Sequence, residues 1–263
     1  MRQPSLGALV VSLVAIAVLV FMLAPIVVIG LYAFSDASVQ VWPIARFSLR
    51  AFAEAWNNRE IRAAFGLSLR IATVATSLAV VIATLLAFVI HRFRFFGRGA
   101  ASFAVMLPIA LPGIITGIAL NSYFAFAGIQ LSTTTLIIAH TTFCIVIVYT
   151  NVLARLKRLP ASFVEASMDL GANGFRTFWR VTLPMIASAI ASGALLAFAL
   201  SFDEVIVTTF TAGVQTTLPL WIFGAIRLGQ HLNQVNVVVL AVIVVTAVPV
   251  LISQTLLARA DEI

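Results

Sequence analysis

Two neighbouring carboxylates lie inside an apolar stretch of this sequence, where a charged group is most able to do chemistry. Asp203 and Glu204 follow the run 195–202, which carries no charge. A charge inside a membrane span is costly and marks a functional candidate, and a carboxylate at low dielectric attracts a cation. Adjacent helical residues point about 100° apart. One carboxylate can therefore line a path while the other contacts a partner, and a structural pair that binds helix ends is the alternative.

Other polar side chains also interrupt apolar stretches. His140 can gate a path or relay protons, but an imidazole within a membrane also serves as a hydrogen-bonding group between helices. Asn121, Tyr123 and Tyr149 are further polar residues within apolar runs. They are candidates for lining a path, with helix packing as the alternative.

A broken helix is expected within residues 107–113, which read Leu-Pro-Ile-Ala-Leu-Pro-Gly. Pro108 and Pro112 remove backbone hydrogen bonds, which a membrane tolerates only where protein or a water-filled cavity satisfies the freed groups. Broken helices often mark a transport path. A proline kink that serves packing alone is the other interpretation.

The elements that must position these residues are membrane helices. The chain has 263 residues, of which 62% are hydrophobic and 10% charged, and its mean hydropathy is +1.12. About 20 apolar residues cross the hydrocarbon core. The sequence therefore predicts an all-α polytopic membrane protein with six transmembrane helices in one domain, over residues 6–34, 66–90, 100–127, 135–153, 185–210 and 235–258. The first run is too long for a cleaved signal peptide.

The distribution of charge and of cysteine predicts how these spans are oriented and which partners and sites are not expected. The basic linkers 91–98 and 154–184, with Arg2 and Arg259, predict that both termini face the cytoplasm by the positive-inside rule. The chain has a formal net charge of +7, but it has no long basic stretch with interleaved aromatics outside the spans, so we expect no nucleic-acid partner. Cys144 is the single cysteine, so neither an intrachain disulfide nor a metal cluster is expected.

The linker 154–184 contains the signals of a short helix. Ser162 and Glu165 have the spacing of a capping box, which predicts a helix start. Gly171 can take the left-handed conformation that ends the helix. A second short helix is expected from Phe175 to about Val181, before Pro184 opens the fifth span. A two-turn helix is unstable alone in water, so it packs on its own spans or docks into a groove of a partner.

This linker resembles the "EAA loop" of ABC importer permeases. That family has Glu-Ala-Ala, then Gly, then Ile-x-Leu-Pro at the same spacings, and Ser167 and Val181 are mild departures. The resemblance implies the type I permease fold and a coupling helix seated in a groove of an ATPase subunit. The residues that it assigns to this coupling are Glu165, Ala166, Ser167, Asp169, Leu170, Gly171, Leu183 and Pro184.

The resemblance extends over almost the whole chain to the second permease of the spermidine/putrescine-type group, in segments 140–144, 165–172, 200–205 and 217–220. It implies a bacterial inner-membrane assembly with a homologous second permease, two ATPase subunits that bind ATP and Mg²⁺, and an extracytoplasmic solute-binding protein. No cofactor is expected in this chain. Permeases of this group often have an acidic residue where Gly113 stands, so a small organic solute other than a polyamine stays open.

Two functions from other classes compete with this interpretation. A secondary transporter acting without an ATPase would commonly show internal repeats, and the two halves of the chain do not match convincingly. An intramembrane enzyme would use Asp203 or Glu204 as an acid or base, but no second carboxylate lies in another span. The single lysine, Lys157, lacks the glycine-rich turn of a P-loop, so we expect a non-catalytic subunit energised by others.

Overall fold

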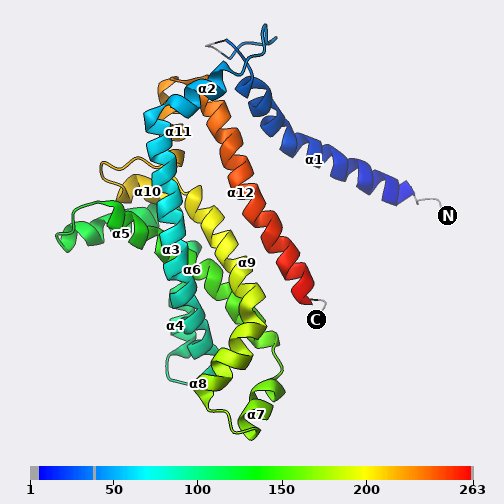
Figure 1. Ribbon diagram of the computed structural model, residues 1–263, viewed down its shortest axis with the longest axis vertical. Helices are drawn as coiled ribbons and strands as arrows, with labels where there is room; N and C mark the ends of the chain where they lie inside the picture. Colours follow the sequence, from blue (N-terminus) through cyan, green and yellow to red (C-terminus); the bar gives the residue numbers. More distant parts are fainter. Residues whose placement is uncertain (1–5, 38–39, 262–263) are drawn as a thin grey trace. The chain divides into compact units, whose positions relative to one another are not determined.

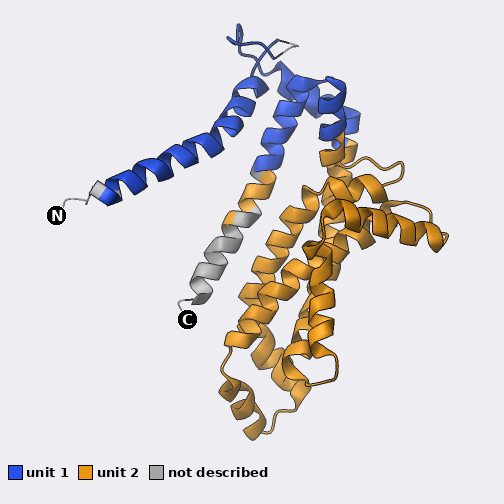
Figure 2. Cartoon of the chain, turned by 180° about the vertical axis from the view of Figure 1, so that it is seen from behind, with its two compact units in different colours: residues 1–62, 222–243 blue, residues 63–221, 244–263 orange. Residues whose placement is uncertain are grey.

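The computed structural model describes residues 6–37 and 40–261, so Arg2 lies outside the described residues. Within these ranges every regular element is a helix (Figure 1), apart from one isolated bridge between Ser35 and Phe47. Figure 2 shows two compact units: residues 1–62 with 222–243, and residues 63–221 with 244–263. The protein is therefore all-α, as predicted.

The first unit contains α1 (Leu6–Ala33), α2 (Arg50–Asn57) and parts of three later helices. Two aromatic rings join the segment after α1 to α2, because the centroids of Phe34 and Phe52 lie 4.9 Å apart. Asn58 donates from its side-chain amide to Gln234 Oε1 at 2.9 Å. Polar contacts of this kind hold the start of α12 (Leu232–Asp261) within the unit.

Helix α1 is apolar on all sides and is exposed along most of its length. Its sequence from Leu9 to Ala33 has a mean hydropathy of 3.0 over its best window, and none of that window is buried. A helix that is hydrophobic all round needs lipid or another apolar surface around it. Its composition therefore suits a membrane span.

The second unit is a helical bundle that carries the polar residues singled out above. Its elements are α3 (Arg59–Arg92, from Ala63 on), α4 (Arg98–Ala110), α5 (Gly113–Phe126), α6 (Thr133–Arg158), α7 (Ala161–Asp169), α8 (Gly174–Thr177), a π-helical turn (Phe178–Thr182), α9 (Leu183–Phe202), α10 (Ile206–Thr211), the start of α11 (Leu218–Leu228) and the end of α12.

Helices α6 and α9 form the centre of this bundle. They approach closely because Gly193 presents only hydrogen to α6, and a Cβ there would lie 3.2 Å from the Cα of Val148. Helix α3 adds Ala79, Ala83 and Ala87, which are fully buried at four-residue spacing. Small residues at interfaces let membrane helices pack closely in the absence of a hydrophobic driving force.

The described residues contain four helices that are long and apolar enough to span a membrane, within Leu9–Ala33, Arg59–Arg92, Thr133–Arg158 and Gly174–Phe202. The pair α4 and α5 makes a fifth if the broken helix is one span. The predicted span 235–258 falls in α12, whose described apolar stretch, Leu232–Val248, is shorter. The structure thus supports four to five of the six predicted spans.

Two predicted helix boundaries were wrong. The span 185–210 is not one helix, because α9 ends at Phe202 and α10 begins at Ile206. Helix α7 begins at Ala161 with Pro160 as its N-cap, so Ser162 forms no capping box. Proline, with φ −61° and ψ 131°, already supplies the extended residue that precedes the helix.

Candidate functional site

The break between α9 and α10 separates the roles of the two carboxylates. Glu204 Oε1 accepts a hydrogen bond from the backbone N–H of Val207 at 2.9 Å, which satisfies a free donor in the first turn of α10. Asp203, directly after α9, is exposed, and its carboxylate makes no hydrogen bond or ion pair with any residue the structure describes. Glu204 is therefore committed to the fold, while Asp203 is available.

His140 lies across the same break. It projects from α6, is only 2% exposed, and contacts one hydroxyl on each side of the gap. Its Nδ1 lies 2.8 Å from Ser201 Oγ, and its Nε2 lies 3.0 Å from Thr208 Oγ1. Both ring nitrogens are thus engaged with protein, which fits the hydrogen-bonding role rather than a relay.

Ser201 and Thr208 were not among the residues singled out from the sequence. They stand seven positions apart, which in the continuous helix predicted over 185–210 is about two turns and would place both hydroxyls on one face. Hydroxyl residues at that spacing, opposite an intramembrane histidine, are the signal that could have found them.

Asn121 and Tyr149 are likewise bound to other helices. The Asn121 amide donates to the Phe210 carbonyl oxygen at 2.6 Å, which joins α5 to α10. The Tyr149 hydroxyl lies 2.7 Å from Ser102 Oγ, which joins α6 to α4, and the tyrosine is fully buried. Tyr123 is different, because 61% of it is exposed.

The predicted interruption of the third span is present. Helices α4 and α5 are bent by 107° at the break between Ala110 and Gly113. The Thr116 hydroxyl contacts the Pro108 carbonyl oxygen at 3.4 Å, so a side chain serves one backbone group near the break. A Cβ on Gly113 would lie 3.6 Å from Ile206 Cγ2, at the start of α10. The breaks in α4–α5 and α9–α10 therefore adjoin each other.

Helix α7 ends as the sequence predicted, at a left-handed glycine. Gly171 has φ +84°, and its N–H donates to the Met168 carbonyl at 2.8 Å while the Ala172 N–H donates to Ser167 at 3.1 Å. This pair of bonds is a Schellman motif, which satisfies the last carbonyls of a helix. The end of α7 is therefore defined by local backbone chemistry.

The rest of the loop holds α7 against the bundle. Ser167 Oγ lies 3.0 Å from Thr177 Oγ1 of α8, and Asn173 caps α8 by accepting from the Arg176 N–H at 2.9 Å. The second short helix, predicted over 175–181, is observed as α8 followed by the π-helical turn, which continues into α9 with Pro184 in its first turn.

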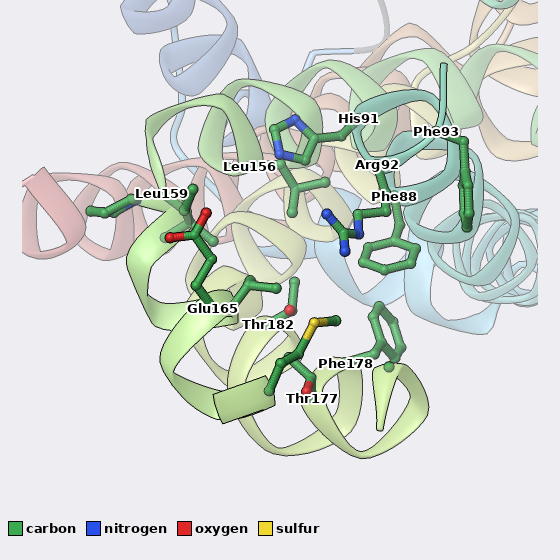
Figure 3. A pocket seen from close by; sticks show the side chains of 15 residues that line it. Phe88, His91, Arg92, Phe93, Leu156, Leu159, Glu165, Thr177, Phe178 and Thr182 are labelled. Atoms are coloured by element: carbon green, nitrogen blue, oxygen red, sulfur yellow. The ribbon is translucent and has the colours of Figure 1, made fainter. Parts of the chain in front are cut away.

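Several side chains of the loop face away from the bundle. Phe163 is 51% exposed and Leu170 is 90% exposed, and Glu165, Ala166 and Asp169 are exposed as well. A cavity of about 510 Å³ lies on the other side of α7, between it and the ends of α3 and α6 (Figure 3). Glu165 lines this cavity, so one coupling candidate belongs to both surfaces.

Residues 79–261 match the family of the "Binding-protein-dependent transport system inner membrane component". The putrescine transport system permease protein PotI of Escherichia coli K12 is 35% identical, over 92% of this chain and 88% of the relative. The spermidine/putrescine transport system permease protein PotC of the same strain is 31% identical, over 92% of this chain and 91% of the relative. PotC of Haemophilus influenzae is 33% identical, over 79% and 81%.

Two solved structures share the fold. A chain of a bacterial ABC transporter that imports the acidic polysaccharide alginate superposes with a TM-score of 0.71 at 15% identity, covering 98% of this chain and 99% of that one. A chain of an alginate ABC transporter in complex with an alginate pentasaccharide-bound periplasmic protein gives 0.70 at 18% identity, covering 97% and 94%.

The family model covers most of the chain, and the relatives cover nearly all of it. The resemblance inferred from the linker 154–184 is thereby confirmed. The protein is a multi-pass protein of the bacterial inner membrane, and ATP hydrolysis resides in separate subunits. This chain belongs to the binding-protein-dependent transport system inner membrane components, as the permease subunit of an ABC importer.

Proposed function

We propose that this permease forms, with a sister permease, the path for a small organic cation of the polyamine class. The relatives named for putrescine and spermidine support the substrate class. In this proposal residues 1–263 act as one permease domain with six spans, the sixth within α12, and both termini face the cytoplasm. Two ATPase subunits, the second permease and an extracytoplasmic binding protein complete the assembly.

The loop 154–184 is proposed to couple transport to ATP hydrolysis, and the exposed apolar side chains of α7 carry this proposal. Phe163, on the nine-residue α7, and Leu170, its C-cap, are both exposed, and Gly171 defines the end of the helix. Burying such side chains in a partner groove is favourable, at roughly 1.5–3 kcal/mol for a fully covered Leu or Phe. Helix-in-groove docking is a standard mode of recognition, and the ATPase subunit is the partner that must sense this chain.

Charge supports the cytoplasmic position of this loop. Lys157, Arg158, Arg176 and Arg180 all lie in it or at its edges. Short loops rich in lysine and arginine stay on the cytoplasmic side. The ATPase subunits, which consume cytoplasmic ATP, are on that side too.

Asp203 is our proposed cation-attracting residue of the substrate path, with Tyr123 beside the path. Of the polar residues considered, these two are exposed, whereas His140, Asn121 and Tyr149 bind other helices. An exposed carboxylate next to apolar walls attracts an ammonium group. Gly113 lacks the acidic side chain that is frequent at this position in the group. Ile206 lies beside Gly113, and Asp203 is three residues before Ile206 in the chain. Asp203 can therefore supply the missing charge in the same region.

Transport in proteoliposomes tests the coupling proposal. The full assembly is reconstituted with its binding protein, and uptake of labelled putrescine is measured with and without internal ATP. Glu165→Ala should abolish uptake while the permease remains in the membrane. Glu54→Ala is the matched control, because Glu54 pairs only with exposed Arg50 and such pairs contribute little. Normal uptake by both Glu165→Ala and a Gly171 variant would refute the coupling role.

Competition tests the substrate class. Excess unlabelled spermidine should reduce putrescine uptake, and a neutral solute of similar length should not. Gly113 favours a second candidate, an uncharged small organic solute, because that position contributes no anionic group. ATP-dependent uptake of a neutral solute together with no uptake of either polyamine would establish this second candidate.

A further inference from the structure

The residues that line the cavity behind α7 form a feature that the proposed coupling role of α7 does not explain. Its lining is largely apolar and comes from the ends of α3 and α6 and from the loop, with Phe88, Leu156, Val164, Met168 and Phe178 among the apolar residues. Its volume of about 510 Å³ falls in the range of roughly 300–1,000 Å³ that small-molecule sites occupy. An apolar space of this size next to α7 can accept a ligand.

Positive charge gathers at one side of this cavity. His91 and Arg92, from the last turn of α3, line it, and Figure 3 shows the Arg92 guanidinium directed between Leu156 and Phe88. Neither side chain makes an ion pair or hydrogen bond with a residue the structure describes. Burial lowers the pKa of His91, and the neighbouring charges of Arg98, Lys157 and Arg92 lower it further, so this imidazole adds no positive charge at neutral pH. Glu165 is the single carboxylate among the lining residues and offsets Arg92, so the positive balance comes from Arg98 and Lys157 close by.

The length of α3 sets the depth of this charge. Its 34 residues extend about 51 Å at 1.5 Å per residue, which exceeds the roughly 30 Å of hydrocarbon. The predicted span ends at residue 90, so His91 and Arg92 are expected in the layer of lipid headgroups. Basic pockets between membrane helices on the cytoplasmic side bind anionic headgroups.

We propose that this cavity binds one anionic phospholipid of the inner leaflet, with its phosphate near Arg92 and an acyl chain in the apolar space behind α7. The inference rests on the proposed function, because that places α7 on the cytoplasmic side. The lipid supports α7 from the bundle side while the ATPase occupies the exposed side. Charge complementarity selects the anionic lipid over a zwitterionic one.

Photocrosslinking in the complete transporter tests this site. The assembly is placed in nanodiscs that contain diazirine-labelled phosphatidylglycerol or the matched phosphatidylcholine, illuminated, digested and mapped by mass spectrometry. Adducts are expected on peptides that carry Leu156 or Met168, and with phosphatidylglycerol only. Arg92→Gln should lower them about five-fold, the factor for about 1 kcal/mol per basic residue at a lipid surface. Arg94→Gln, whose residue does not line the cavity, is the matched control.

A second variant removes the space and keeps the charge. Met168→Trp fills the cavity, and it should abolish the adducts with Arg92 intact. Equal labelling by both lipids, labelling that ignores Arg92 and Met168, or labelling only when the ATPase is absent would overturn the proposal. Substrate-stimulated ATP hydrolysis is measured in the same nanodiscs. Normal stimulation without adducts refutes only the lipid site, whereas absent stimulation in the unaltered assembly refutes the proposed function.

Discussion

Gly117 of α5 lies directly under the ring of Phe210 of α10. A Cβ at position 117 would lie 2.7 Å from Phe210 Cδ2 and 3.2 Å from its Cγ. The two short helices thus pack at a distance that only glycine allows, and Asn121, one turn further along α5, bonds the Phe210 carbonyl oxygen. This contact joins the broken third span to the segment that follows Asp203.

Substitution of Gly117 is expected to separate α5 from α10. Gly117→Ala forces the Phe210 ring to move, and overpacking of this kind costs typically 1–3 kcal/mol. Thermal unfolding of the purified assembly should show a lower midpoint, and uptake should fall. Gly113→Ala is the control, because a Cβ there meets Ile206 at an ordinary 3.6 Å. Equal stability of the two variants would contradict the close contact.

His140 is expected to stabilise the helix break rather than carry protons. His140→Phe leaves the hydroxyls of Ser201 and Thr208 without their imidazole partner. Hydrogen bonds between membrane helices contribute about 0.6 kcal/mol on average, so the unfolding midpoint should fall modestly. A double-mutant cycle with Ser201→Ala measures the coupling. Loss of transport at unchanged stability and zero coupling would instead favour a relay.

The two adjacent carboxylates should respond differently to neutralisation. Asp203→Asn removes an exposed charge without a protein partner, so uptake of a cationic substrate should fall while stability is unchanged. Glu204→Gln keeps an oxygen that can accept from the Val207 N–H but loses the charge that strengthens the bond, so stability should fall by less than the roughly 1 kcal/mol of a lost helix-start acceptor. Uptake kinetics and thermal unfolding, measured for both variants, show which carboxylate serves transport and which serves stability. The reverse pattern would show that Glu204 faces the path.

Gly171 should be intolerant because of its backbone and not its surroundings. Its φ is +84°, and nothing lies within 4 Å of a Cβ built there. Gly171→Ala places an L side chain in the left-handed region at roughly 1–2 kcal/mol, which loosens the end of α7. ATP hydrolysis should become less dependent on substrate. Gly174→Ala, in a helix and equally open, is the control and should keep normal coupling.

The sequence by itself determined the class of the protein and several of its local features. Long uncharged runs such as 9–33 require lipid, because no core of this chain could bury them. Pro108, Pro112 and Gly113 determined the break between α4 and α5, since prolines lack the N–H that a continuous helix uses. Gly171 determined the end of α7 for a different reason: the left-handed conformation that ends this helix is open to glycine without steric cost.

Only the tertiary structure decided which polar residues are available. No proline or glycine marks the end of α9 at Phe202, and hydroxyl groups on the two sides of that break contact His140 of α6. Asp203 and Glu204 are chemically alike in sequence, and the positions at which α9 ends and α10 begins let Glu204 reach the N–H of Val207 while Asp203 stays exposed. Partners far apart in the chain meet only after folding, because helical periodicity specifies a face and not the helix that it will meet.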